Sequence, residues 1–255
     1  MSPLEALLLG ILQGITEFLP ISSSGHLKLG EWLLGMNHLD QYIAFDLTCH
    51  VGTLLALFAV LYRDIWHVLT RDRKMLGMLM LGLLPLLPLY FFLKPIKALY
   101  GAPQYIGFFF LVTASLLFLG EALANRVKRP AKRSDALLIG VAQACAILPA
   151  VSRSGATMAA ARSLGWDRTQ AARFSFLLSI PTILGGLLIE GKELFETTGS
   201  AISPVVYGIG LVSAFVTGYF VLRGLFKLLK RMTLRPFAYY CTAVGLFTLI
   251  YMSMA

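Results

Sequence analysis

The stretch EALLLGILQGITEFLPISSSG, residues 5–25, has a counterpart in DALLIGVAQACAILPAVSRSG, residues 135–155. Eight of the 21 positions are identical without a gap. The matching residues of the first stretch are Ala6, Leu7, Leu8, Gly10, Gln13, Ser22, Ser24 and Gly25. Chance matching in apolar sequence favours leucine and alanine, but it rarely places a glutamine and a Ser-x-Ser-Gly ending in register. The chain therefore predicts two repeats, over residues 1–130 and 131–255.

The composition around these stretches is that of a membrane protein. Of the 255 residues, 57% are hydrophobic and 14% are charged, whereas soluble domains carry about 25% charged residues. Long apolar blocks approach the roughly 20 residues that a helix needs to cross a bilayer. The sequence thus predicts an all-α integral membrane protein with six transmembrane helices. The blocks are 42–63, 75–93, 104–124, 169–190, 203–223 and 236–254.

The net charge of +9 is concentrated in three links between the blocks, at 63–74, 125–135 and 227–235. Cytoplasmic loops carry an excess of lysine and arginine, so we expect these links on the cytoplasmic side. This distribution explains the basic charge as a topology signal and excludes a nucleic-acid partner. It also places both termini in the periplasm.

The repeated stretches themselves are too short to span. The links at 125–135 and 227–235 are both basic, so the chain crosses the membrane an even number of times between them. The blocks at 169–190 and 203–223 supply two crossings, so the segment 136–165 crosses zero or two times. PAVSRSG breaks this segment into pieces of about 14 and 11 residues, each shorter than the ~20 residues of a spanning helix. We expect a re-entrant helix hairpin here, and a second one around Pro20. Each half then has one hairpin and three spans, which is an odd number, so the repeat has inverted topology.

Both breaks suit an anionic ligand. Serine is a favoured helix N-cap, and helix N-termini bind anions through their free N–H groups. Arg153 adds a fork of donors that matches phosphate. Gly25 and Gly155 would let the backbone approach a ligand closely. Ser22, at the first break, belongs with these residues as a ligand contact.

The break around Pro20 also carries side chains that could take part in catalysis. Glu17 is an acid at membrane depth, which is costly and suggests a functional site. Gln13 lies one turn earlier on the same face, either in the site or as a hydrogen-bonding link between helices. Ser23 is either a cap or a nucleophile. His26 is either a satisfied polar residue or a proton donor and acceptor.

Other polar residues have two readings as well. Ser152, Ser154 and Thr157 either cap the second half-helix or touch the ligand. Asp46 and His50 share a helix face and resemble metal ligands, but a buried pair that holds helices together is the favoured interpretation.

The residues of both breaks resemble a known family. QGITEFLPISSSGH and LPAVSRSGAT resemble the two signature stretches of the undecaprenyl-diphosphate phosphatase family, the bacitracin-resistance proteins of bacterial inner membranes. FDLTCHVGTLLAL and FSFLLSIPTILGG, which follow the two motifs, extend the resemblance over essentially the whole chain. The resemblance implies an inverted-repeat fold with two re-entrant hairpins. It also implies hydrolysis of the lipid carrier diphosphate to the monophosphate, with Mg²⁺ or Ca²⁺ as an aid.

The resemblance also assigns site residues. The family's acidic motif falls on Gln13 and Glu17, and many members have glutamate where this chain has Gln13. Glu17 is therefore the one carboxylate of the motif and the candidate ligand of the cation. The remaining motif positions are Ser22, Ser23, His26, Ser152, Arg153, Ser154, Gly155 and Thr157.

The leading hypothesis is a membrane phosphohydrolase that recycles the lipid carrier for cell-wall synthesis. Glu17, Ser23, His26 and Arg153 would be its catalytic residues, with a polyprenyl diphosphate lipid as substrate. A homodimer is compatible with the sequence. A transporter or polyprenyl-phosphate flippase is the alternative, because inverted repeats and broken helices are typical of transporters. A type-2 phosphatidic acid phosphatase is disfavoured, since no histidine follows SRSG.

Overall fold

The structure is a computed structural model, and it describes residues 1–36, 39–89, 105–124, 131–196 and 202–254. Within these ranges every regular element is a helix, which agrees with the all-α prediction. The α-helices run over Pro3–Thr16 (α1), Ser23–Leu33 (α2), Ile43–Thr70 (α3), Arg73–Leu83 (α4), Ile106–Ala122 (α6), Arg133–Cys145 (α7), Arg153–Ser163 (α8), Arg168–Glu196 (α9), Pro204–Leu229 (α10) and Arg235–Met254 (α11). Short 3₁₀ turns cover Leu39–Tyr42 (η1) and Leu84–Leu86 (η2).

Four of the described helices are long and apolar enough to cross a bilayer: α3, and the segments Arg168–Ile189, Pro204–Leu229 and Arg235–Ser253 of α9, α10 and α11. These four correspond to four of the six predicted spans. The block predicted at 104–124 contains α6, which has only 17 residues. The chain is therefore a multi-pass membrane protein in which four helices match predicted spans in length and apolarity, and the count of six spans stays a prediction.

The block predicted as a helix over 75–93 is shorter than expected. The α-helix ends at Leu83, and a 3₁₀ turn follows through Leu86. Pro85 and Pro88 account for this end, because proline has no backbone N–H to donate and clashes with the preceding turn. The rest of the block, from residue 90, lies outside the described residues.

Both predicted helix pairs are present. α1 and α2 have 14 and 11 residues and are separated by residues 17–22. α7 and α8 have 13 and 11 residues and are separated by 146–152. All four helices are shorter than the ~20 residues that a bilayer requires. A re-entrant path for the two pairs stays a prediction, as does the inverted repeat.

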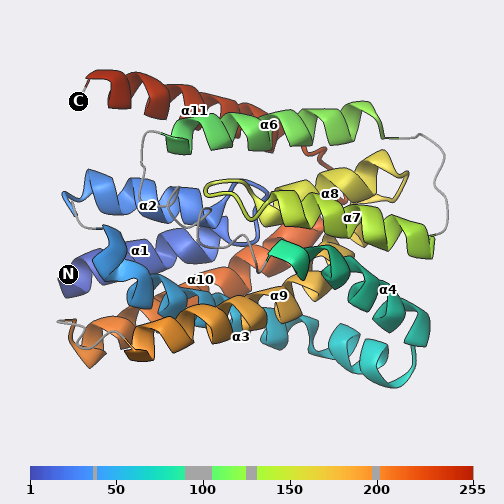
Figure 1. Cartoon of the computed structure of the whole chain (residues 1–255), viewed down its shortest axis with the longest axis horizontal. Coiled ribbons are helices and arrows are strands. Elements are labelled where there is room, and N and C mark those ends of the chain that lie inside the picture. Colours follow the sequence, from blue (N-terminus) through green and yellow to red (C-terminus); the bar gives the residue numbers. More distant parts are fainter. Residues whose placement is uncertain (37–38, 90–104, 125–130, 197–201, 255) are drawn as a thin grey trace.

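Close helix packing positions the two pairs (Figure 1). α1 packs along α10, and α7 packs along α4. Gly10 of α1 faces Gly210 of α10, where a Cβ atom would lie 2.7 Å from the Gly210 oxygen. Gly140 of α7 likewise faces Gly82 of α4, at 2.4 Å from the Gly82 oxygen. These glycines let the backbones approach, so each short helix is fixed against a neighbour from the other half of the chain.

α6 and α11 form a further layer along one edge of the molecule, where they lie side by side (Figure 1). α6 also packs against α8, and α8 packs against α9. The buried apolar core includes Phe18, Phe110, Trp166, Phe174 and Phe176. The connecting loops of the two helix pairs meet within this framework, away from the ends of the chain.

Candidate active site

The two connecting loops are in direct contact. A Cβ atom on Gly25 of α2 would lie 2.8 Å from the Ala150 Cβ of the other loop. A Cβ atom on Gly155 of α8 would lie 3.2 Å from the Pro20 oxygen. A close approach of these glycines to a ligand stays a prediction. The two glycines allow the loops to interlock. Residues 130 positions apart in the chain therefore lie together in one site.

Serines cap the second helix of each pair, as predicted. Ser22 Oγ accepts a hydrogen bond from the Gly25 N–H at 3.3 Å, and Ser152 Oγ accepts one from the Gly155 N–H at 3.0 Å. The helices begin earlier than SSSG and SRSG suggested, because the cap is the first serine of each motif. As a result, Ser23 and Arg153 are the first residues of α2 and α8.

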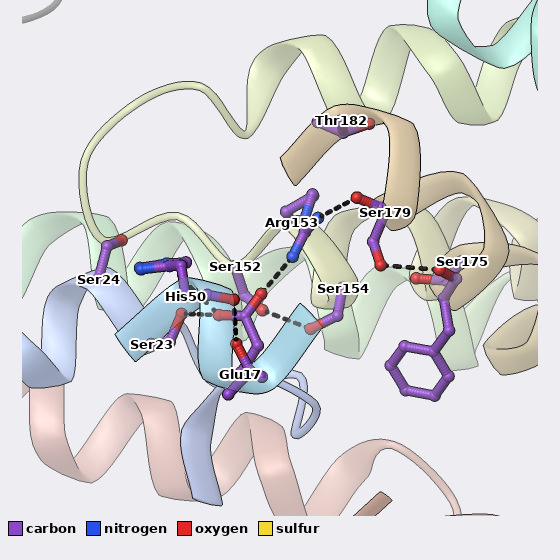
Figure 2. A network of polar contacts seen from close by, with 12 residues as sticks. Glu17, Ser23, Ser24, His50, Ser152, Arg153, Ser154, Ser175, Ser179 and Thr182 are labelled. Carbon is purple, nitrogen blue, oxygen red and sulfur yellow. Dashed lines mark hydrogen bonds and ion pairs between the residues drawn. The ribbon is translucent and has the colours of Figure 1, made fainter. Parts of the chain in front are cut away.

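Glu17, directly after α1, is the hub of the site (Figure 2). Its Oε2 atom accepts hydrogen bonds from Gln13 Nε2 at 3.0 Å and from Ser23 Oγ at 2.6 Å. Its Oε1 atom accepts one from the Arg153 guanidinium at 2.5 Å. The side chain is 2% exposed, so Arg153 supplies the charge partner that a buried carboxylate needs.

Arg153 reaches Glu17 from the second loop and retains further donors. Its second terminal nitrogen donates to the Ser179 backbone oxygen of α9 at 3.3 Å. The side chain is 20% exposed, which is more than its carboxylate partner. Arg153 is also the first residue of α8. Binding of an anion by its guanidinium and the start of this helix stays a prediction.

His50 of α3 lies beside Glu17, although the sequence favoured it as a structural partner of Asp46 rather than as a site residue. Its Nε2 atom lies 3.6 Å from Glu17 Oε2, and its Nδ1 atom lies 2.8 Å from the backbone oxygen of Asp46 (Figure 2). The two side chains therefore do not form the pair expected from sequence, since the Asp46 carboxylate pairs with Lys28 of α2 instead. Asp46 does hold two helices together, but with a different partner.

His26 is engaged elsewhere. One ring nitrogen lies 2.6 Å from the Ser22 backbone oxygen, and the other lies 2.8 Å from the Tyr240 hydroxyl of α11. The imidazole stacks on the Tyr240 ring at 5.6 Å between centroids. Neither nitrogen is directed at Glu17 or Ser23, so a proton-transfer role for His26 stays a prediction.

The remaining motif residues surround the loops. Ser154 Oγ donates to the Leu19 backbone oxygen at 3.2 Å and thus joins the second loop to the first. Ser152 Oγ lies 3.2 Å from Ser154 Oγ. The Thr157 hydroxyl contacts the Ser175 hydroxyl of α9 at 2.6 Å and the Arg153 backbone oxygen at 2.9 Å. These contacts are structural, and ligand binding by the three residues stays a prediction.

The donor set around Glu17 fits a hard cation only in part. Among the described residues, no group of three or more His, Cys, Asp or Glu side chains is gathered for a metal. Gln13 Oε1, however, is a buried acceptor without a hydrogen-bond partner, next to the Glu17 carboxylate. Mg²⁺ commonly uses one or two carboxylates and completes its shell with water and substrate phosphate. The site therefore fits a cation that arrives with phosphate oxygens.

Known proteins resemble this chain over nearly its whole length. The family described as Bacitracin resistance protein BacA matches residues 6–247. A protein of Protochlamydia amoebophila named undecaprenyl-diphosphatase is 43% identical over 98% of both chains. Proteins of the same name from Halothermothrix orenii and Methanosphaera stadtmanae are 39% and 35% identical, over 96% and 97% of both chains. With a match that covers both loops and nearly the whole length, this chain belongs to the bacitracin resistance protein BacA family.

Proposed function

We propose that this protein hydrolyses undecaprenyl diphosphate to undecaprenyl phosphate and inorganic phosphate, which returns the lipid carrier to cell-wall synthesis. Membership of the BacA family and the undecaprenyl-diphosphatase relatives support this activity. The observation that carries it is the Glu17 carboxylate, which a hydroxyl contacts from its own loop and a guanidinium contacts from the other. In this proposal Glu17 is the base, Ser23 is the nucleophile and Arg153 is the fork that binds phosphate.

In the mechanism that we infer, Arg153 and the N–H groups at the start of α8 hold the terminal phosphoryl group. Ser23 Oγ attacks the phosphorus while its proton passes to Glu17 Oε2, which already accepts a hydrogen bond from this hydroxyl at 2.6 Å. The bond between phosphorus and the bridging oxygen breaks, and the lipid monophosphate leaves. Arg153 and the helix N-termini stabilise the charge on the phosphoryl oxygens during this step.

Water then attacks the phosphorylated Ser23. The bond between phosphorus and Ser23 Oγ breaks, Glu17 returns its proton to the serine, and both protons of water leave with inorganic phosphate. Gln13 orients the Glu17 carboxylate through the hydrogen bond from its Nε2 atom. In this account His26 positions the first turn of α2 through its contacts with Ser22 and Tyr240.

A divalent cation, Mg²⁺ or Ca²⁺, forms part of the proposal. Glu17 and the unpartnered Gln13 Oε1 would hold it together with substrate oxygens. The cation would neutralise charge on the diphosphate. The protein's own residues would still bind, attack and transfer the proton as described.

The test is phosphate release from undecaprenyl diphosphate by the purified protein in detergent, where transport across a membrane does not occur. The proposed function predicts turnover that requires this protein. A transporter or flippase of the same architecture would bind the lipid and release no phosphate, which would contradict the proposal.

We further propose that the protein lies in the bacterial inner membrane with both termini in the periplasm, and that its halves have inverted topology. The basic links at 63–74 and 227–235 support this orientation. Single cysteines, placed on a background without Cys49, Cys145 and Cys241, test it by labelling in intact cells. A cysteine at Arg231 should be protected and one at Ser2 should be labelled by a membrane-impermeant reagent. The reverse pattern would refute the orientation.

A further inference from the structure

A second polar cluster lies apart from the contacts of Glu17, between α2 and α3. Lys28 Nζ lies 2.9 Å from Glu31 Oε2 and 2.8 Å from Asp46 Oδ2. The side chains of Lys28, Glu31 and Asp46 are 12%, 0% and 13% exposed. Two carboxyl groups and one ammonium are therefore enclosed together where α2 meets α3.

One oxygen of each carboxyl group lacks a described hydrogen-bond partner. Glu31 Oε1 and Asp46 Oδ1 are both buried and have no hydrogen-bond partner among the residues that the structure describes. A buried polar atom without a partner is costly, and buried acceptors are normally satisfied. The cluster therefore lacks a positive group or a donor at these two oxygens.

The charges of the three residues indicate which group would balance the cluster. With both acids ionised, the cluster carries two negative charges against one positive charge in a place with little solvent. Like charges that share a buried site cannot both ionise easily, so one carboxyl group holds a proton. We propose that Glu31 holds a proton beside the Lys28 ammonium and the Asp46 carboxylate, and that this proton-binding site fastens α2 to α3.

The surroundings add one more titratable group. Among the described residues, the charged groups that act on Glu31 are Lys28 of its own helix and Asp46 of α3. The Cys49 thiol of α3 is the other titratable group on which both acids act. It is fully buried and brings no positive charge. The proton is thus the group that balances the cluster.

The site has a consequence for the reaction centre. α2 begins with Ser23, five residues before Lys28. α3 carries His50 one turn after Asp46, with its Nε2 atom 3.6 Å from Glu17. The proton on Glu31 joins the helix that presents the serine to the helix that presents this histidine. Loss of the proton leaves two ionised carboxylates that repel each other across the α2–α3 contact.

Thermal unfolding in detergent tests the proposal without substrate. The folded protein binds a proton that the unfolded chain releases near neutral pH, so its stability falls as the pH rises. Glu31→Gln keeps the shape and the donor of a protonated acid without titrating. We expect the unfolding midpoint of the wild type to fall further than that of Glu31→Gln from mildly acidic to mildly alkaline pH.

The matched control is Asp64→Asn, which removes an α3 acid whose partner is Arg173 at 3.2 Å on the surface. Its pH dependence should follow that of the wild type. If Glu31→Gln also follows the wild type over the whole pH range, no proton is bound at the cluster and the proposal fails.

Infrared spectroscopy provides a second readout should Glu31→Gln not fold. At neutral pH the wild type should show the C=O stretch of a protonated carboxyl group. Asp46→Asn removes the competing carboxylate, so Glu31 ionises beside Lys28 and the band should disappear, while Asp64→Asn should keep it. Absence of the band in the wild type, or its persistence in Asp46→Asn, would overturn the proposal.

Discussion

The two helix pairs, α1–α2 and α7–α8, share one pattern of serine caps. In each, a serine caps the second helix and accepts a hydrogen bond from the glycine three residues later. In each, the capping serine also lies close to the serine two residues later, at 3.5 Å between the Oγ atoms of Ser22 and Ser24 and 3.2 Å between those of Ser152 and Ser154. The shared residues of the two motifs therefore make the same capping contacts twice.

The pairs differ where the chemistry lies. Glu17 of the first stretch aligns with Ile147 of the second, and Ser23 aligns with Arg153. The first loop thus supplies the acid and the hydroxyl, and the second supplies the guanidinium. This difference shows that neither helix pair contains the complete candidate active site. The site exists only where the loops interlock.

The largest loss of activity should follow removal of the Ser23 hydroxyl, which has no counterpart in the second pair. If Ser23 is the nucleophile, Ser23→Ala should reduce kcat by more than about a thousandfold, because no other group takes over the attack. Rapid quenching with substrate labelled in its terminal phosphate, followed by mass spectrometry, should find phosphate on Ser23. Ser24→Ala is the matched control, since Ser24 contacts Ser22 rather than Glu17. A Ser23→Ala enzyme with a substantial fraction of the wild-type rate would show that water attacks directly.

The next largest loss of activity should follow replacement of the Arg153 guanidinium, which has no counterpart in the first pair. Arg153→Lys keeps the charge but loses the fork, and we expect kcat/KM to fall by about a hundredfold, as for the loss of one preorganised donor. Arg173→Lys, at a surface pair with Asp64, should have little effect. Phosphate release measures both variants, and a thermal unfolding curve confirms folding. Near-normal turnover of Arg153→Lys would reduce the arginine to a structural role.

The smallest effect concerns the two capping serines. Ser22 has a positive φ of 71°, whereas Ser152 has a φ of −70°. A non-glycine residue with positive φ is strained by roughly 1–2 kcal/mol. Replacement of an N-cap serine by glycine costs only a few tenths of a kcal/mol. Ser22→Gly should therefore maintain or raise stability, and Ser152→Gly should lower it. Unfolding midpoints measured in detergent test this prediction. Equal changes of the midpoint in the two variants would show that Ser22 is not strained.

Local features of the sequence predicted much of this arrangement. Glu17 and Gln13 are four residues apart on one helical turn, so their contact follows from helix geometry. The serine caps and the break at each loop follow from proline and serine preferences. The early end of α4 could also have been predicted, since Pro85 and Pro88 are visible in the sequence.

Long-range contacts were harder to predict. His26 contacts Tyr240, 214 positions away, and no local pattern connects the two residues. His50 reaches Glu17 because α3 packs against α1, which depends on the whole fold. Arg153 was placed in the site by the repeat, although its direct contact with Glu17 was not foreseen.

A double-mutant cycle tests most directly whether the two loops form one reaction centre. We would measure kcat/KM for phosphate release by Glu17→Gln, Arg153→Lys and the double variant in detergent. Residues that act as a unit are strongly non-additive, so the double variant should be no worse than the more impaired single variant. Losses that multiply in the double variant would show that the two residues act independently. That result would contradict a site built jointly by both loops.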